Sequence, residues 1–388
     1  MSHPKIAIIG AGPSGLTLAR ILHINNIPST VFEKDTSPHI RPQGGTLDLH
    51  EESGERALRV SSLWEEYQRH VRYESEDFVL ANRFGKTFFA IQNTATGRPE
   101  VDRTALRQIL LDSLPREYIR WGCKLIKVEE GTLHFEHGIE RGFDLIVGAD
   151  GAWSKVRPVV SHISPFYSGV SGVEIRLRDF DTKYPELGKM VGRGSLFVFG
   201  EEDGRSMMCQ RQGDGSVRIY TFMAKPESWM EDCDINIKDP AVIRAVLLAE
   251  YRDWAPEFKK LVEACDDDMD LRKIYMLPVG LRWWPRPGIT LIGDAAHLMT
   301  PMAGEGVNMA LRDALELAES IIKHPDNLAT AVAEHKKAIF PLIQETQQIT
   351  WDYTLTWFGP GALAKFKIWM ESWVGEAKID RSRIESAC

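Results

Sequence analysis

The 388-residue sequence lacks most features that mark a disulfide scaffold, a zinc protein or a membrane protein. It has only five cysteines, none in a CxxC pair and none near histidines at a spacing typical of zinc sites, so no metal site is expected. Few cysteines in an odd number suit a reducing compartment, and we expect a cytoplasmic protein. No run of about 18 uncharged apolar residues occurs, which predicts that no helix spans a membrane.

Basic residues are fewer than acidic residues in this sequence. Lysine and arginine number 47 against 55 aspartates and glutamates, which gives a formal net charge of −8. An acidic chain without a basic stripe is not expected to bind nucleic acid or an anionic membrane surface. Internal repeats and low-complexity tracts are absent as well. The composition, 43% hydrophobic and 26% charged, is ordinary for a globular chain, and the length predicts about two domains.

The start of the chain has the pattern of a nucleotide-binding fold. Residues 5–9 (KIAII) form an apolar, partly β-branched run, which predicts a buried strand. Residues 14–25 have helical periodicity, and residues 29–33 (STVFE) predict a second strand. A strand, a helix and a strand in this order indicate a parallel sheet covered by helices.

The middle of the chain has a different pattern. Within residues 160–280, strands with alternating polarity are expected at 194–200 and 216–223. This favours an antiparallel sheet inserted into the first domain. The earlier pattern returns with an expected strand at 289–292 and a long helix at 307–322.

A GxGxxG motif (GAGPSG, residues 10–15) stands between the first strand and the first helix. Glycines there allow a tight turn and close approach to a pyrophosphate, which the free N–H groups of the helix start attract. Glu33 ends the second strand, where its carboxylate can accept hydrogen bonds from ribose hydroxyls and would repel a 2′-phosphate. The motif therefore favours FAD or NAD over NADPH, although a turn that binds nothing is the alternative. The predicted contacts are Gly10, Gly12, Ser14, Gly15 and Glu33.

Two further motifs follow expected strands. The first is GADG at residues 148–151, and the second is GDAAH at residues 293–297, which leads into GEGVN at residues 304–308. A carboxylate at the end of a strand can bond a ribityl hydroxyl, and we assign this role to Asp294. The N–H groups at the start of the following helix can face the N1/O2 edge of an isoalloxazine and stabilise the anionic reduced flavin. The predicted contacts of this segment are Gly304, Gly306, Val307 and Asn308.

The three motifs in this order resemble the class A flavin-dependent monooxygenases of the p-hydroxybenzoate hydroxylase fold. A further segment, RPQGGTLDLH at residues 41–50, resembles the tetracycline destructase group within that family. This resemblance implies that Arg41 contacts NADPH and that Asp48 and Arg103 contact FAD, with Gly45 in the same segment.

The residues themselves support part of this assignment. Arg103 falls in the first turn of an amphipathic helix expected at 101–114, where the helix dipole does not favour a cation. Its position suggests an anionic or polar partner such as FAD, although pairing with Asp102 or Glu100 is the alternative. His297 is expected to be a structural residue of the flavin-side loop rather than a base.

The resemblance implies an α/β fold. It has a discontinuous Rossmann-like FAD-binding domain (1–160 and 280–345), an inserted antiparallel-sheet substrate domain (161–279) and a bridging C-terminal helix (346–388). The implied activity is hydroxylation or epoxidation of an aromatic or polycyclic small molecule through a flavin C4a-hydroperoxide. FAD is bound, NADPH or NADH donates electrons transiently, and O2 is consumed. Because the flavin carries the chemistry, no protein nucleophile is needed, and the sequence identifies no catalytic side chain. We expect a monomer or weak dimer.

The substrate is not determined by the sequence, because the middle segment departs from the destructases. Arg218 stands where that group has a histidine, and Glu174 or a neighbour stands where it has a glutamine. The candidate substrate contacts are Arg218, Phe222, Met223 and Pro301, although an apolar residue on a strand is often a core residue.

Other activities also fit the motifs. Baeyer–Villiger insertion, oxidative cyclisation, tetracycline inactivation and a non-catalytic flavin-binding redox sensor stay open. Halogenation is disfavoured because the Trp-x-Trp-x-Ile-Pro segment of flavin halogenases is absent.

Overall fold

The computed structural model describes residues 4–38, 40, 44–91, 99–233, 236 and 239–372. The chain divides into two compact units, each described separately below. Unit 1 consists of Met1–Val71, Val101–Phe166 and Tyr275–Trp351, and unit 2 consists of Arg72–Glu100, Tyr167–Ile274 and Asp352–Cys388.

A five-stranded parallel sheet forms the centre of unit 1. Its order is β17-β11-β1-β2-β7, and every neighbouring pair is parallel. Helix α1 (Pro13–Ile24) connects β1 to β2, as the sequence predicts. The strands are β1 (Ile6–Ile9), β2 (Ser29–Phe32), β7 (Ile119–Arg120), β11 (Leu145–Gly148) and β17 (Ile289–Leu291).

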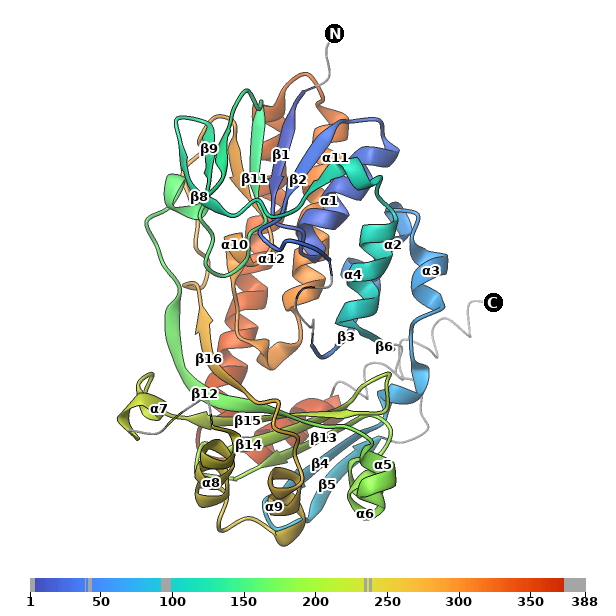
Figure 1. Ribbon diagram of the computed structural model, residues 1–388, viewed down its shortest axis with the longest axis vertical. Helices are drawn as coiled ribbons and strands as arrows, with labels where there is room; N and C mark the ends of the chain where they lie inside the picture. Colours follow the sequence, from blue (N-terminus) through green and yellow to red (C-terminus); the bar gives the residue numbers. More distant parts are fainter. Residues whose placement is uncertain are drawn as a thin grey trace. The chain divides into compact units, whose positions relative to one another are not determined.

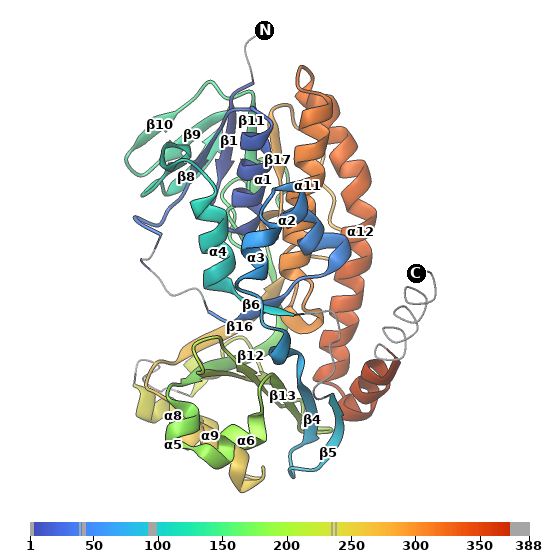
Figure 2. The same cartoon turned by 90° about the vertical axis from the view of Figure 1, so that its right-hand side faces the viewer.

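The parallel sheet of unit 1 has a different layer on each face (Figures 1 and 2). Ile6 and Ile8 of β1 join an apolar core that includes residues of α1, α4 (Arg103–Asp112) and α11 (Gly306–Lys323). Ala7 and Ile9 join a second core with residues of a small antiparallel sheet. That sheet contains β8 (Leu125–Glu129), β9 (Thr132–Phe135) and β10 (Gly138–Glu140). Because side chains alternate along a strand, β1 is buried on both faces, which explains its continuous apolar run.

Several further elements belong to unit 1 wholly or in part. β3 (Thr46–Asp48) pairs with β6 (Glu100–Asp102), and the long helix α12 (Leu328–Trp357) contains Pro341. The residues of β6 and α12 are divided between the two units, and η2 (Tyr73–Glu76) lies in unit 2. The others, all in unit 1, are η1 (Glu51–Glu55), α2 (Arg56–Val60), α3 (Trp64–Gln68), η3 (Arg116–Tyr118), η4 (Arg157–Val159), α10 (Asp294–His297) and η5 (Pro301–Ala303).

Unit 2 is built on a seven-stranded sheet in the order β16-β12-β15-β14-β13-β4-β5. Its strands are β4 (Phe78–Asn82), β5 (Thr87–Ile91), β12 (Phe166–Leu177), β13 (Ser195–Phe199), β14 (Ser206–Arg211), β15 (Val217–Ala224) and β16 (Asp270–Met276). Helices α5 (Phe180–Lys183), α6 (Pro185–Val191), α8 (Pro240–Glu250) and α9 (Pro256–Glu263) lie on one face of the sheet (Figure 1). Helix α7 (Trp229–Asp232) follows β15.

The predicted fold class is confirmed: a parallel α/β sheet and a second, mainly antiparallel sheet are both present. The units differ from the predicted domain division in the segment Arg72–Glu100, which falls in unit 2. The physical reason is that β4 pairs with β13 in parallel, a contact between distant parts of the sequence. The C-terminal helix predicted at 346–388 also differs, because α12 runs from Leu328 to Trp357 and a separate helical segment follows from residue 362.

Two further outcomes concern helices. The helix expected at 101–114 begins only at Arg103, because Asp102 is still extended in β6. Among the residues that the structure describes, no helix combines the length and the apolar character that crossing a membrane requires.

Candidate functional site

Two glycines of the GxGxxG loop are required by the packing of the chain itself. Gly10 has a φ of 110°, and a Cβ atom there would lie 2.3 Å from the carbonyl oxygen of Ala149. A Cβ atom at Gly15 would lie 2.1 Å from the carbonyl oxygen of Gly10. Since both clashes are with backbone atoms, neither position has room for a side chain. These glycines shape the turn from β1 into α1.

Gly12 has no such internal reason to be glycine. Its φ of −84° is accessible to any residue, and a Cβ atom there would meet nothing within 4 Å. Gly12 is the N-cap residue of α1, and Pro13 is the first residue of that helix. No side chain caps the helix, and its first turn contains no acidic residue. The first N–H groups of a helix lack partners within the helix and attract anions. The open space at Gly12 therefore fits a phosphate group that approaches the backbone closely.

Glu33 is buried at the end of β2 and holds the glycine loop. Its carboxylate accepts the N–H groups of Ala11 (2.6 Å) and Asp35 (2.9 Å). A carboxylate has about four acceptor positions, so positions for ribose hydroxyls remain. Arg107 of α4, which sequence reasoning missed, donates to the carbonyl oxygens of Ala11 (3.3 Å) and Pro38 (2.7 Å). Its only sequence signal is its position one turn after Arg103.

Arg103 and Asp294 are charged groups that the fold leaves available. Arg103 begins α4, and its side chain is exposed. Its backbone N–H donates to the carbonyl oxygen of Gly45 (3.1 Å). Asp294 begins α10 just after β17, and its side chain is solvent-accessible. Surrounding protein nevertheless raises the pKa of Asp294 by desolvation, against the charges of His297 and Arg103.

A carboxylate that lies in a recess is both solvent-accessible and partly desolvated. Because the Asp294 side chain is exposed, a ligand can reach it. Within the described part of the chain, neither the Arg103 nor the Asp294 side chain has a hydrogen bond or an ion pair. The alternative pairing of Arg103 with Asp102 or Glu100 is therefore wrong. Both charges are free for a polar cofactor group.

The start of α11 supplies a second open helix end. A Cβ atom at Gly306 would meet nothing within 4 Å, as at Gly12. Gly304 has a φ of 71°, and a Cβ atom there would lie 3.7 Å from Oδ1 of Asp48. Asp48 ends β3, so this loop and the GGTLD segment lie side by side.

The predicted role of Asn308 needs a correction for its side chain. The buried amide donates to the carbonyl oxygen of Asp48 (3.0 Å) and accepts the N–H of His50 (2.9 Å). The side chain thus fastens the segment after β3 onto α11. Val307 also has a buried side chain. What remains for a ligand at Gly306, Val307 and Asn308 is the backbone N–H groups of the first turn.

His50 lies beside this turn between two carboxylates. Its Nε2 atom is 3.0 Å from Oδ2 of Asp48, and its Nδ1 atom is 3.3 Å from Oε1 of Glu305. Burial lowers the pKa of His50, but the hydrogen bonds and charges of the two carboxylates raise it to about 9. Sequence reasoning assigned His50 no role. The Asp-x-His spacing on an extended segment is the signal that was available.

His297 belongs to a buried group with Asp313 and His335, all three at most 1% exposed. Asp313 accepts the N–H of Gly293 (2.8 Å) and contacts Nε2 of His297 (3.0 Å) and of His335 (2.5 Å). Burial raises the pKa of Asp313, but the two histidines outweigh it and lower this pKa to about 2. His297 is therefore a structural residue, as expected.

The same group places Asp294, because it fixes the turn at Gly293. A Cβ atom at Gly293 would lie 2.6 Å from Oγ of Ser14, so the first and third motifs are neighbours. The Ser14 side chain lies against this turn. In the second motif, Asp150 accepts the N–H of Lys155 (2.6 Å) and so closes its own turn.

The substrate candidates on β15 separate onto opposite faces of the unit 2 sheet. Met223 lies in the core beneath the helices of that unit, whereas Phe222 faces the other way, since neighbouring side chains alternate. Met223 is a core residue, and its prediction as a substrate contact is wrong. Arg218 shares the face of Phe222 and forms an ion pair with Glu174, which also binds Arg272 (2.6 Å).

Two predicted residues remain. Pro301 is exposed at the start of η5 in unit 1. Arg41 lies outside the described residues.

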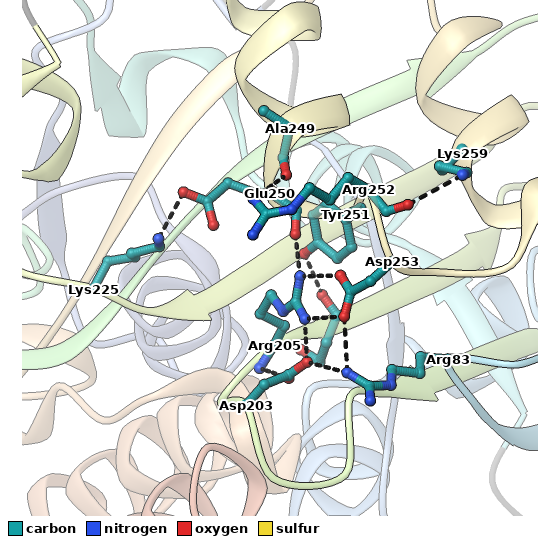
Figure 3. Close-up of polar contacts among 11 residues, drawn as sticks. Arg83, Asp203, Arg205, Lys225, Ala249, Glu250, Tyr251, Arg252, Asp253 and Lys259 are labelled. Atoms are coloured by element: carbon teal, nitrogen blue, oxygen red, sulfur yellow. Dashed lines mark hydrogen bonds and ion pairs between the residues drawn. The ribbon is translucent and has the colours of Figure 1, made fainter.

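Unit 2 contains a charged hollow of about 330 Å³. Arg205 donates to the carboxylates of Asp203 and Asp253, and Arg83 donates to the same two (Figure 3). The lining has three cations (Arg205, Lys225 and Arg252) and three carboxylates (Asp203, Glu250 and Asp253). These charges cancel, so the network stabilises unit 2 and does not favour an ionic ligand.

Comparisons with known proteins agree with the cofactor site. A family profile described as "FAD binding domain" matches residues 4–83 and 278–331. Monooxygenase penA of Penicillium thymicola is 32% identical over 412 residues, covering 89% of this chain and 94% of that protein.

Two solved structures are also similar to this chain. HpxO of Klebsiella pneumoniae, complexed with FAD and uric acid, has a TM-score of 0.76 at 20% identity and covers 97% of this chain and 93% of its own. Tetracycline destructase Tet(55) has a TM-score of 0.74 at 18% identity and covers 97% of each chain. At these identities the two structures support the fold alone. The similarity to penA extends over nearly the whole of both proteins, and this chain belongs to the FAD-dependent monooxygenases.

Proposed function

We propose that this FAD-dependent monooxygenase hydroxylates or epoxidises an aromatic or polycyclic small molecule. Bound FAD supplies electron transfer from NAD(P)H to O2, and the chain supplies binding, orientation and electrostatics. The observation that carries the proposal is the pair of accessible, unbonded charges, Arg103 and Asp294, beside two open helix starts.

The residues of unit 1 suggest how FAD is held. The space over Gly12 and the N-terminus of α1 suit the pyrophosphate, and the remaining acceptor positions of Glu33 suit the adenosine ribose. Asp294 suits a ribityl hydroxyl, and Arg103 suits a phosphate or ribityl oxygen. The free N–H groups at the start of α11 suit the flavin ring.

The remaining predicted residues serve these contacts indirectly. Gly10 and Gly15 shape the pyrophosphate loop, and the Ser14 side chain packs against the turn before Asp294. Gly45, Asp48 and Gly304 shape the segment beside the start of α11. In this assignment Asn308 contributes its backbone, while its side chain positions Asp48.

Two observations support an aromatic or polycyclic substrate. HpxO was solved with uric acid, and Tet(55) is named for tetracycline, so similar folds accept planar or polycyclic compounds. In unit 2, the rings of Tyr220 and Phe222 stack with centroids 5.6 Å apart and planes at 13°. A flat ring suits this stacked pair.

Tetracycline inactivation is the second candidate, because residues 44–50 (GGTLDLH) match the destructase segment. We favour the first candidate because Arg218 is ion-paired with Glu174. The polar groups that this pair offers to a substrate differ from those of the destructase pocket. We also infer a monomer or weak dimer in the cytoplasm. The four cysteines in the described residues are free, which supports a reducing compartment.

The test is oxygen tracing under ¹⁸O2. The purified enzyme with NADPH is screened against aromatic, heteroaromatic and polycyclic compounds, with tetracycline included, for stimulated NADPH oxidation. Products of the active compounds are analysed by mass spectrometry. We expect one ¹⁸O atom per product molecule. Products that form without label would overturn the oxygenase assignment.

A further inference from the structure

His50 connects three parts of unit 1. It lies two residues after the end of β3, and its ring contacts Asp48 at 3.0 Å and Glu305 at 3.3 Å. Glu305 is the cap residue of α11, and the backbone N–H of His50 donates to Asn308 in the first turn of that helix (2.9 Å). One residue thus joins the segment after β3 to both the cap and the first turn of α11.

The geometry favours a charged His50 ring. A neutral imidazole has one N–H donor, whereas the imidazolium has two. Carboxylates face both ring nitrogens of His50, so both contacts are hydrogen bonds only in the charged form. The pKa of His50, about 9, agrees with a ring that is charged at neutral pH.

Other charged groups lie on the elements around His50. Glu55 of η1 interacts with His50 electrostatically and is itself paired with Arg59 of α2 at 3.2 Å. From α11, Arg312 donates to the carbonyl oxygen of Glu52 (2.5 Å), beside Glu51 in the same segment. Acidic groups therefore predominate on the elements packed against His50, and they favour its protonated form.

We propose that His50 is a positioning residue of the cofactor site: its imidazolium ties the carboxylates of Asp48 and Glu305 together and so holds the segment after β3 against the first turn of α11. This inference rests on the proposed function, in which the N–H groups of that turn face the flavin. When His50 loses its proton, one of the two carboxylates loses its hydrogen bond to the ring, and the contact between the segment after β3 and α11 weakens. The affinity for FAD then falls as the pH rises through the titration of His50. The Asn308 amide, which does not titrate, preserves part of the affinity.

The experiment measures the FAD dissociation constant by flavin fluorescence between pH 7 and 10.5. The proteins are the wild type, His50→Gln, Glu305→Gln and the control His70→Gln. His70 is an exposed histidine 3.4 Å from Glu66, so the control makes the same substitution at a surface carboxylate pair. Circular dichroism at each pH verifies that each protein stays folded. Titration of FAD itself affects all four proteins alike.

For the wild type and His70→Gln we expect the dissociation constant to rise roughly tenfold or more across the alkaline range, the worth of one charged hydrogen bond. His50→Gln should bind FAD more weakly by a similar factor at pH 7.5 and show no alkaline transition. Glu305→Gln removes one anion that favours the imidazolium, so its transition should move to lower pH by roughly one unit. A residue with a merely structural role would not produce that shift.

Three results would overturn the inference while leaving the proposed function in place: no pH dependence in the wild type, an unchanged transition in His50→Gln, or an unmoved transition in Glu305→Gln. A wild-type protein that binds no FAD at any pH would overturn the proposed function and this inference with it.

Discussion

Two alanine substitutions in one loop should separate cofactor binding from folding. At Gly12 a methyl group meets nothing of the protein within 4 Å and φ is ordinary, whereas at Gly15 it would lie 2.1 Å from a backbone oxygen. Gly12→Ala should therefore change the free energy of unfolding of the apoprotein by only about 0.5–1 kcal/mol, the cost of a poorer cap residue. Gly15→Ala should cost roughly 3 kcal/mol or more, because the rigid backbone has to move.

The order of the effects reverses for FAD. The methyl group of Gly12→Ala occupies the space that we assign to the pyrophosphate and separates it from the N–H groups of α1. Loss of one or two hydrogen bonds to a charged group, at roughly 1.5–3 kcal/mol each, weakens FAD binding roughly tenfold to a thousandfold or more.

Urea unfolding of the apoproteins gives the stabilities, and flavin fluorescence titration gives the dissociation constants. Wild-type FAD affinity in Gly12→Ala would refute the placement of the pyrophosphate at this loop. An apoprotein of Gly12→Ala as unstable as that of Gly15→Ala would refute the steric argument.

Three further predictions concern other side chains. Asp294→Ala should lose FAD on gel filtration at an unchanged apoprotein melting temperature, because its carboxylate has no partner within the described part of the chain; wild-type flavin occupancy by absorbance ratio would contradict the assignment. Asp313, with its pKa lowered from 3.8 to about 2, should contribute about 2 kcal/mol above pH 4 that disappears as the pH falls to 2, so the stability gap between wild type and Asp313→Asn in urea should narrow over that range. A gap independent of pH would count against the His–Asp–His group. Arg205→Met should lower the free energy of unfolding by about 1–3 kcal/mol, a range that allows for the partial exposure of its partner Asp253. The control Arg252→Met loses one 3.3 Å hydrogen bond to the Ala249 carbonyl oxygen and should change this free energy by less than about 0.5 kcal/mol. Equal effects of the two substitutions in thermal melts would argue against the network.

The local parts of the fold could be predicted from the sequence. β1, α1 and β2 follow one another, and their apolar periodicity and glycines specify both the elements and their order. The strand β4 could not be placed this way, because its partner β13 lies more than a hundred residues away and no local pattern records that pairing. The period of two along β15 likewise predicted a strand without saying which face is covered, so Met223 was assigned to the wrong side.

The candidate site shows the same limit. Motifs identified the glycines, Glu33 and Asp294, because each has a characteristic place at a strand end or helix start. The roles of His50 and Asp313 could not be predicted from the sequence, because they arise from tertiary contacts. The N–H of His50 bonds a residue 258 positions away, and Asp313 meets His335 from a different helix. Asn308 was found by motif, but its side chain turned out to bind protein.

The visible absorption spectrum of the purified protein, recorded before and after anaerobic addition of NADPH, shows whether the protein holds a reducible flavin. An FAD-dependent monooxygenase should show oxidised-flavin bands that bleach on reduction and return with air. A colourless protein whose flavin bands are not restored by added FAD would contradict the account.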